Sequence, residues 1–128
     1  MRYYMAKTTK GAFDAVLGKV MEGLKAEGFG VLTDIDVQET LKKKIGVDFR
    51  RYRILGACNP PLAYQALQAE DKIGTMLPCN VIVQDIGNGE IEVATIDPAA
   101  AMAKVGNASL AEVAGTVRQK LEAVLDRL

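Results

Sequence analysis

The sequence predicts an α+β fold in which an antiparallel sheet carries two long helices on one face. Three observations support this prediction: amphipathic helical segments lie near both ends of the chain, apolar and polar residues alternate between them, and an Asn88-Gly89 pair marks a tight hairpin. Because consecutive strands tend to be neighbours, the expected order is strand, helix, four strands, helix, with two short helical excursions. We expect the 128 residues to form one domain, 1–128.

Two long helices are predicted to bracket the chain. Residues 9–27 place apolar side chains at helical spacing, and Gly28 is suited to end that helix. Ser109 and Glu112 form the pattern of a capping box ahead of the second helix. The apolar positions are Phe13, Val16, Leu17, Val20, Met21 and Leu24 in the first helix, and Val113, Val117, Leu121, Val124, Leu125 and Leu128 in the second.

Strands are predicted between these helices and at the start of the chain. Alternation of apolar and polar residues is typical of a strand with one covered face. The Asn88-Gly89 pair favours the positive backbone angles of a tight turn between two of the strands. The five predicted strands cover residues 2–7, 31–37, 50–57, 81–86 and 91–96.

Two connections carry short helices. Residues 36–44 end in three lysines, which complement the negative end of a helix dipole. Asn59 followed by two prolines opens a helix that should run to about Ala69, because Asn caps helices and Pro suits the first turn. The segment 50–86 would also permit a parallel crossover unit, since about twenty intervening residues suffice for one.

The composition argues against several classes of function. Lys plus Arg and Asp plus Glu are both 16, so no global charge attracts nucleic acid or a membrane surface. Histidine is absent, which removes the commonest general base and the Ser–His and Cys–His nucleophile pairs. No segment has the pattern of a secretory signal or the roughly 18 apolar residues of a membrane span. We therefore expect a cytoplasmic protein without a cofactor, a nucleic-acid partner or a membrane partner.

The two cysteines each lie in a turn that contains proline. Cys58 ends one predicted strand and Cys79 begins the next, so an antiparallel pairing would bring both thiols to one end of the sheet. A parallel pairing would place them at opposite ends. Cys58 also precedes a predicted helix, whose free amides and dipole would stabilise a thiolate. The candidate ligand-binding residues of these turns are Cys58, Asn59, Pro60, Pro78, Cys79 and Asn80.

Three interpretations of the thiols stay open. They could pack as small buried residues, or line a ligand pocket. They could instead serve a thiol-based redox, sulfur-transfer or metal-thiolate protein, with Cys58 as nucleophile and Cys79 as resolving thiol. No metal site is assigned, because two thiolates do not complete a four-ligand zinc site.

A basic stretch on the strand 50–57 has two interpretations. Its side chains could grip an anionic ligand, or pair with acidic residues on a neighbouring strand. The arginines are Arg50, Arg51 and Arg53, and the acidic candidates are Asp34, Asp36 and Asp48.

The cysteine turns lie within longer motifs. Tyr52-Arg53-Ile54-Leu55-Gly56-Ala57-Cys58-Asn59-Pro60 is followed by Gly74-x-x-Leu77-Pro78-Cys79-Asn80. These motifs, the strand Gly30–Asp36 and the Asp97-Pro98 pair resemble the signature of the domain of unknown function 302 family, over nearly the whole chain. The resemblance implies small bacterial or archaeal proteins with an α+β fold like a repeat of the TATA-binding protein. It implies no established reaction and hence no catalytic roles.

The sequence leads to two functional hypotheses. The first is a homodimer that binds a small ligand or a partner near the cysteine turns and performs no catalysis, since an acid–base set is absent and the helix-free face of the sheet needs cover. The second is the thiol-based protein that uses Cys58 and Cys79.

Overall fold

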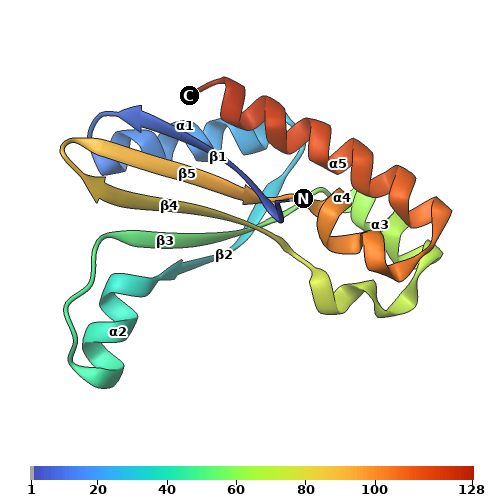
Figure 1. The fold of residues 1–128 in the computed structure, drawn as a ribbon, viewed down its shortest axis with the longest axis horizontal. Helices are drawn as coiled ribbons and strands as arrows, with labels where there is room; N and C mark the ends of the chain where they lie inside the picture. Colours follow the sequence, from blue (N-terminus) through green and yellow to red (C-terminus); the bar gives the residue numbers. More distant parts are fainter. Residues whose placement is uncertain (1) are drawn as a thin grey trace.

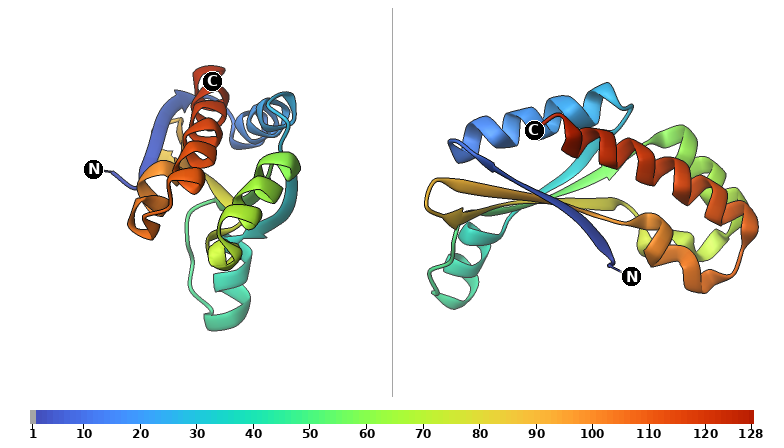
Figure 2. Two further views of the ribbon diagram at one scale, coloured as in Figure 1. Left: turned by 90° about the vertical axis from the view of Figure 1, so that its right-hand side faces the viewer. Right: turned by 45° about the horizontal axis from the view of Figure 1, so that its top comes forward.

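A computed structural model describes residues 2–128. Five antiparallel strands form one sheet in the order β1-β5-β4-β3-β2, and the two long helices α1 and α5 cover the same face of it (Figures 1 and 2). The predicted α+β class and order of elements are confirmed. The elements are β1 (Tyr4–Lys10), α1 (Phe13–Ala26), β2 (Gly30–Asp36), α2 (Val37–Ile45), β3 (Tyr52–Cys58), α3 (Pro60–Ala69), the 3-10 helix η1 (Asp71–Met76), β4 (Cys79–Gly87), β5 (Glu90–Ile96), α4 (Pro98–Met102), the 3-10 helix η2 (Ala103–Val105) and α5 (Ala108–Asp126).

The parallel alternative for residues 50–86 is wrong. Strands β3 and β4 pair antiparallel, with Ala57 opposite Cys79. The chain passes through α3 and η1 and returns to the end of the sheet where β3 finished, so β4 runs back beside β3 (Figure 1). The predicted hairpin between β4 and β5 is confirmed, and Asn88 and Gly89 in its turn have φ of 57° and 75°.

The hydrophobic core lies between the sheet and the two long helices. Helix α1 connects β1 and β2, which form opposite edges of the sheet, and α5 packs beside it (Figure 2). The first half of α5 extends past the sheet and packs against α3 and α4 in a smaller cluster. Fully buried side chains of the main core include Val20, Leu24, Leu55, Val81, Val83, Val93, Leu121 and Val124.

The predicted capping box of the last helix is wrong. The N-cap of α5 is Asn107, whose Oδ1 accepts a hydrogen bond from the Leu110 amide at 3.2 Å. Its Nδ2 also donates to the Ala69 carbonyl at 2.8 Å. Asn107 thus satisfies one free amide of α5 and joins the helix to the end of α3, so Ser109 falls inside the first turn.

The first helix begins later than the predicted residue 9. Residues 8–10 extend β1 instead, where Thr8 faces Glu92 and Lys10 faces Glu90 across the sheet. Pairing with β5 satisfies the backbone hydrogen-bonding groups of these residues. The helical periodicity of the local sequence does not reveal this pairing, because β5 lies far along the chain.

Helix α2 lies apart from the helix layer, on a β2–α2–β3 arm (Figure 1). It follows its predicted range within a residue at each end, and the Asp36 side chain accepts from the Glu39 amide to cap it. None of its residues is buried. Within residues 2–128, no helix has the length and apolar character that spanning a membrane requires.

Candidate functional site

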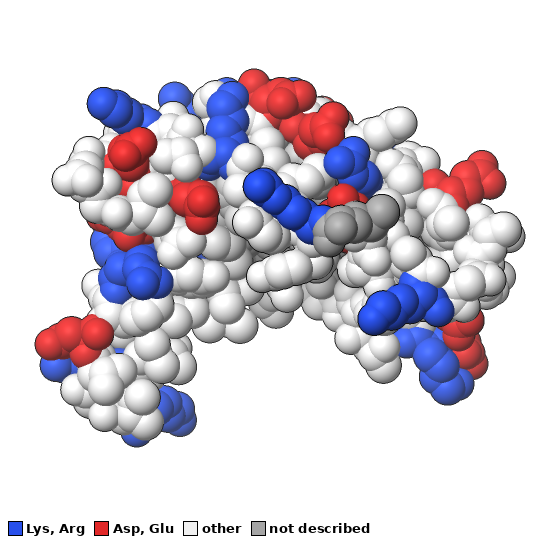
Figure 3. Space-filling view, in the orientation of Figure 1, with Lys and Arg blue, Asp and Glu red and all other residues white. Residues whose placement is uncertain are grey.

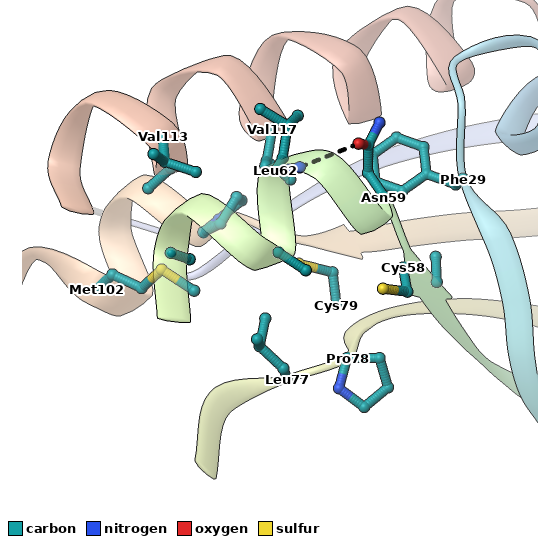
Figure 4. A pocket seen from close by; sticks show the side chains of 15 residues that line it. Phe29, Cys58, Asn59, Leu62, Leu77, Pro78, Cys79, Met102, Val113 and Val117 are labelled. Carbon is teal, nitrogen blue, oxygen red and sulfur yellow. Dashed lines mark hydrogen bonds between the residues drawn. The ribbon is translucent and has the colours of Figure 1, made fainter. Parts of the chain in front are cut away.

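The antiparallel pairing of β3 and β4 brings the two thiols to one place. Cys58 is the last residue of β3, and Cys79 is the first of β4, opposite Ala57. Both line one cavity of about 40 Å³ at the end of the sheet, beneath α3 and beside α4 and α5 (Figure 4). Both are free cysteines, with Cys58 half-buried and Cys79 buried.

The wall of this cavity, which we call the two-thiol cavity, is almost entirely apolar. Asn59 is the one lining residue with an amide side chain, and the wall contains no charged residue. The lining residues are Phe29, Ala57, Cys58, Asn59, Leu62, Ala63, Ala66, Leu77, Pro78, Cys79, Pro98, Met102, Val113, Ala114 and Val117.

Four of the six candidate residues meet in the cavity and two do not. Cys58, Asn59, Pro78 and Cys79 line it. Asn80 follows Cys79 along β4 and therefore points to the opposite face of the sheet, where it is exposed. Pro60 is exposed in the first turn of α3 and is also outside the cavity. The sequence motif thus contains both cavity residues and residues that shape the surrounding backbone.

Burial keeps the deeper thiol protonated. Cys79 is 6% exposed, and desolvation, with a smaller contribution from Cys58, raises its pKa from 9.0 to about 11. A low-dielectric environment disfavours the thiolate because the charge loses its hydration. Cys79 is therefore a neutral thiol at neutral pH when no ligand is bound.

The start of α3 offers fewer free N–H donors to Cys58 than a helix without prolines would. Pro60 and Pro61 occupy the first two helical positions and have no N–H. The next amide, that of Leu62, donates to Asn59 Oδ1 at 3.4 Å (Figure 4). Amide donation is therefore not the means by which this helix would stabilise a thiolate, although its dipole remains.

The predicted helix cap at Asn59 is confirmed, and the same side chain also bonds to the end of α1. Its Oδ1 caps α3, and its Nδ2 donates to the Glu27 carbonyl at 3.3 Å, at the end of α1. Gly28 lies against the same amide: its φ is +86°, and a Cβ there would come within 3.0 Å of Asn59 Nδ2. Asn59 thus fixes the relative position of α1 and α3 at one side of the cavity.

Gly56 is a further motif residue whose role only the structure explains. A Cβ at this position would overlap Thr33 Oγ1 and would come within 2.8 Å of Pro78 Cγ. A glycine within a strand often marks such a close approach. Gly56 therefore allows the Pro78 turn, and with it Cys79, to lie against β3.

The basic stretch has mainly structural partners, and because β3 begins at Tyr52, two residues later than predicted, Arg50 and Arg51 precede the strand. Arg53 donates two hydrogen bonds to the Asp34 carboxylate, at 2.8 and 2.5 Å, as predicted for a cross-strand pair. Arg51 pairs instead with Asp14 at 2.8 Å, and Arg50 lies over the Phe49 ring. The Asp34 hydrogen bond raises the pKa of Arg53, which therefore stays charged.

The Asp97-Pro98 pair also stabilises the cavity wall. Asp97 is buried, accepts from the Ala99 and Ala100 amides at the start of α4, and receives a hydrogen bond from Arg118 Nε at 3.0 Å. This joins α4 to α5, and each of these helices supplies lining residues. Asp97 caps α4 and Pro98 occupies its first turn, a start signal of the kind that predicts α3, although this five-residue helix was not predicted.

The helix-free face of the sheet, here called the open face, forms a second concave surface. Side chains of β1, β3, β4 and β5 line a hollow of about 360 Å³ on it. Figure 3 shows the molecule hollowed on this side, between α2 and the end that carries η1. The hollow is lined by tyrosines, by apolar and amide side chains, by the Glu92 carboxylate and by Thr95. These residues are Tyr3, Tyr4, Tyr52, Asn80, Ile82, Gln84, Glu92, Ala94, Thr95 and Ile96.

The fold is that of a small α+β protein, and its two thiols line one apolar cavity at the end of the sheet. The chain belongs to the family described as domain of unknown function DUF302, whose sequence profile matches residues 5–128. A comparison with curated proteins found no match. The chain is similar to the crystal structure of an uncharacterized conserved DUF302 protein from Bacillus stearothermophilus, with 30% identity, a TM-score of 0.92, and coverage of 99% of this chain and 98% of that one.

Proposed function

We propose that this protein is a homodimeric binding module without catalysis of its own and that the two-thiol cavity is its ligand site. The observation that carries the proposal is the composition of the cavity wall. General acid–base catalysis needs an ionisable group within hydrogen-bonding reach of the substrate, and the wall offers only the two thiols. Free thiols persist in a reducing compartment, which favours the cytoplasm as the site of action.

The size and polarity of the cavity define the kind of ligand. A cavity of about 40 Å³ exceeds the roughly 10–15 Å³ that one water needs. It is smaller than the approximately 150 Å³ of an engineered apolar cavity that admits benzene. The matching ligand is a small, polarisable group of a few heavy atoms.

Xenon tests the cavity directly, because it is apolar, polarisable and about this size. We expect a xenon site beside Cys58 and Cys79 in crystals held under xenon pressure. The variant Ala63→Leu, which extends a lining side chain into the space, should lose that site. Absence of xenon from the wild-type cavity would contradict the ligand site.

A second copy of the chain is the partner that fits the open face. The strand register aligns an apolar row across all five strands, and α2 beside it carries no buried residue. A twofold dimer would place the α2 of each copy in the hollow of the other. The row consists of Ala6, Ala94, Ile82, Ile54 and Ile35.

Charge supports this arrangement. The last turn of α2 contains three lysines, of which Lys42 and Lys43 have acidic partners within the arm. The outward positions of β5 carry Glu90 and Glu92. An incoming α2 therefore brings Lys44, the lysine of this turn for which no acidic partner is described, and exposed Ile45 to a surface with acidic and apolar residues.

Light scattering measures the oligomeric state. We expect a dimer for the wild type and a monomer for Ile82→Lys, which adds a charge to the centre of the apolar row. Leu67→Lys is the matched control, because Leu67 is 43% exposed on α3 and should tolerate the charge without dissociation. A monomeric wild type, or an Ile82→Lys variant that stays dimeric, would contradict the proposed interface.

Thiol-based redox chemistry is the second candidate, favoured by the unequal exposure of the two thiols. The Cys58 thiolate would take the terminal oxygen of a hydroperoxide, and the alkoxide that leaves would be protonated to an alcohol. The Cys79 thiol would then condense with the Cys58 sulfenic acid, forming the S–S bond and releasing water. Peroxide treatment should yield a peptide pair joined through these cysteines, and Cys79→Ser should leave a sulfenic acid that dimedone traps on Cys58. A wild type that peroxide oxidises only to unlinked products, as it does the Cys79→Ser variant, would count against this candidate.

A further inference from the structure

Cys58 and Cys79 bring two free thiols to one cavity. Cys58 and Cys79 lie at the same end of two neighbouring strands, and Cys58 contributes to the raised pKa of Cys79. Both side chains line the same cavity, and Figure 4 shows them together between Pro78 and α3. Their backbones belong to hydrogen-bonded strands, so the spacing of the pair is fixed by the sheet and not by a mobile loop.

Besides the two thiols, the cavity wall contains the Met102 thioether as a further sulfur and no His, Asp or Glu side chain. Among residues 2–128, no cluster of three or more His, Cys, Asp or Glu side chains could hold a metal ion. Structural zinc sites need four such ligands, and Ca²⁺ or Mg²⁺ need several oxygen atoms. A metal bound here must therefore accept two sulfur ligands.

We propose that Cys58 and Cys79 form a two-coordinate thiolate site for a soft monovalent metal ion of the Cu(I) class. Thiolates are the ligands that soft ions such as Cu(I) prefer, and two of them satisfy a linear geometry without help from the wall. This proposal rests on the proposed function, since it assigns a ligand to the same cavity.

The wall of the cavity suits such an ion. Apolar side chains exclude water and the oxygen ligands that would compete for it, and they limit access by oxidants. Half-buried Cys58 gives a route of entry from the surface, while buried Cys79 completes the site. The bound complex carries one negative charge, which the positive end of the α3 dipole, directly after Cys58, would stabilise.

Binding involves ligand exchange and no electron transfer. Each thiol loses its proton to solvent and forms a bond from sulfur to the ion, while the ion keeps its oxidation state. Neither an oxidant nor a reductant is consumed.

Silver(I) is the primary probe, because it has the same preference for two thiolates and is stable in air. We expect native mass spectrometry of the reduced, metal-free protein to detect one Ag⁺ per chain. Cys58→Ser and Cys79→Ser should each lose it. Met76→Leu is the matched control, since Met76 is an exposed sulfur outside the cavity and its loss should leave the stoichiometry unchanged.

Copper affinity provides the second readout. Under anaerobic conditions we expect the wild type to withdraw Cu(I) from a bathocuproine chelator, and Cys58→Ser to do so at least 100-fold less effectively. Because Cys58 is half-buried, this variant should fold even where Cys79→Ser does not. Full Ag⁺ binding by Cys58→Ser, or no binding by the wild type, would overturn the metal site. Xenon in the same cavity would then still support the proposed ligand site, so the two failures are distinguishable.

Discussion

The raised pKa of Cys79 predicts that the protein loses stability in alkali through this one thiol. An unfolded thiol ionises near 9.0, whereas native Cys79 ionises near 11. Between these values the native state binds the proton more strongly than the unfolded state, so the free energy of unfolding falls as the pH rises. The contribution is fully present below pH 9 and is lost through pH 11.

The size of the loss follows from the two pKa values. Each pKa unit corresponds to about 1.36 kcal/mol, and the linkage expression gives a loss of about 2 kcal/mol between pH 8 and pH 10.5. Cys79 is 6% exposed, so solvent screening reduces this value little. The loss is a large part of the roughly 5–15 kcal/mol stability of a typical domain.

Urea unfolding at pH 8 and pH 10.5 measures this loss. The reduced protein, kept metal-free with a chelator, is compared with Cys79→Ala, which cannot ionise at that position. Tyrosines and lysines titrate in both proteins, so their contributions cancel in the comparison. We expect the wild type to lose about 2 kcal/mol more than the variant. Equal losses in the two proteins would refute the argument that burial keeps this thiol neutral.

Two further predictions concern the elements that hold the cavity in place. Gly56→Ala should cost about 1–3 kcal/mol in urea unfolding, because its methyl group would overlap neighbouring side chains. Gly115→Ala is the control, because a Cβ at this position of α5 meets nothing within 4 Å. It should be neutral or slightly stabilising. A similar loss of stability at both sites would show that the overlap at Gly56 is not the cause. Asn107→Ala should lower stability by about 1–2 kcal/mol through loss of the helix cap and of a hydrogen bond to α3. Ser109→Ala should have little effect on stability. A larger loss for Ser109→Ala than for Asn107→Ala would show that Ser109, and not Asn107, caps α5.

Part of the arrangement of the two thiols could be predicted from the sequence. The positions of Cys58 and Cys79 at the ends of successive strands could be predicted from local patterns, but their meeting depended on a topology that the sequence left open. Antiparallel pairing of β3 and β4 resolves it. The remaining wall could not be predicted, because Phe29, Met102 and Val117 come from segments far apart in the chain.

The helix caps also differ in how far the local sequence predicts them. Asn59 and its two prolines specify the start of α3 locally, and that helix has the predicted bounds. The start of α5 depends on Asn107, whose amide also bonds to the end of α3, a contact that sequence spacing does not reveal. Because this cap also makes a hydrogen bond to a second helix, its position depends on how the two helices pack.

By itself, the sequence determined the α+β class, the main helices and strands, the Asn88-Gly89 hairpin and the two thiols as the reactive groups to consider. These follow from the periodicity of side chains and from turn chemistry, which act over a few residues. Only the tertiary structure decided that the thiols share an apolar cavity, that Asn80 lies on the other face, and that the open face is hollow. Those features depend on strand pairing and helix packing between distant segments, which local patterns do not specify.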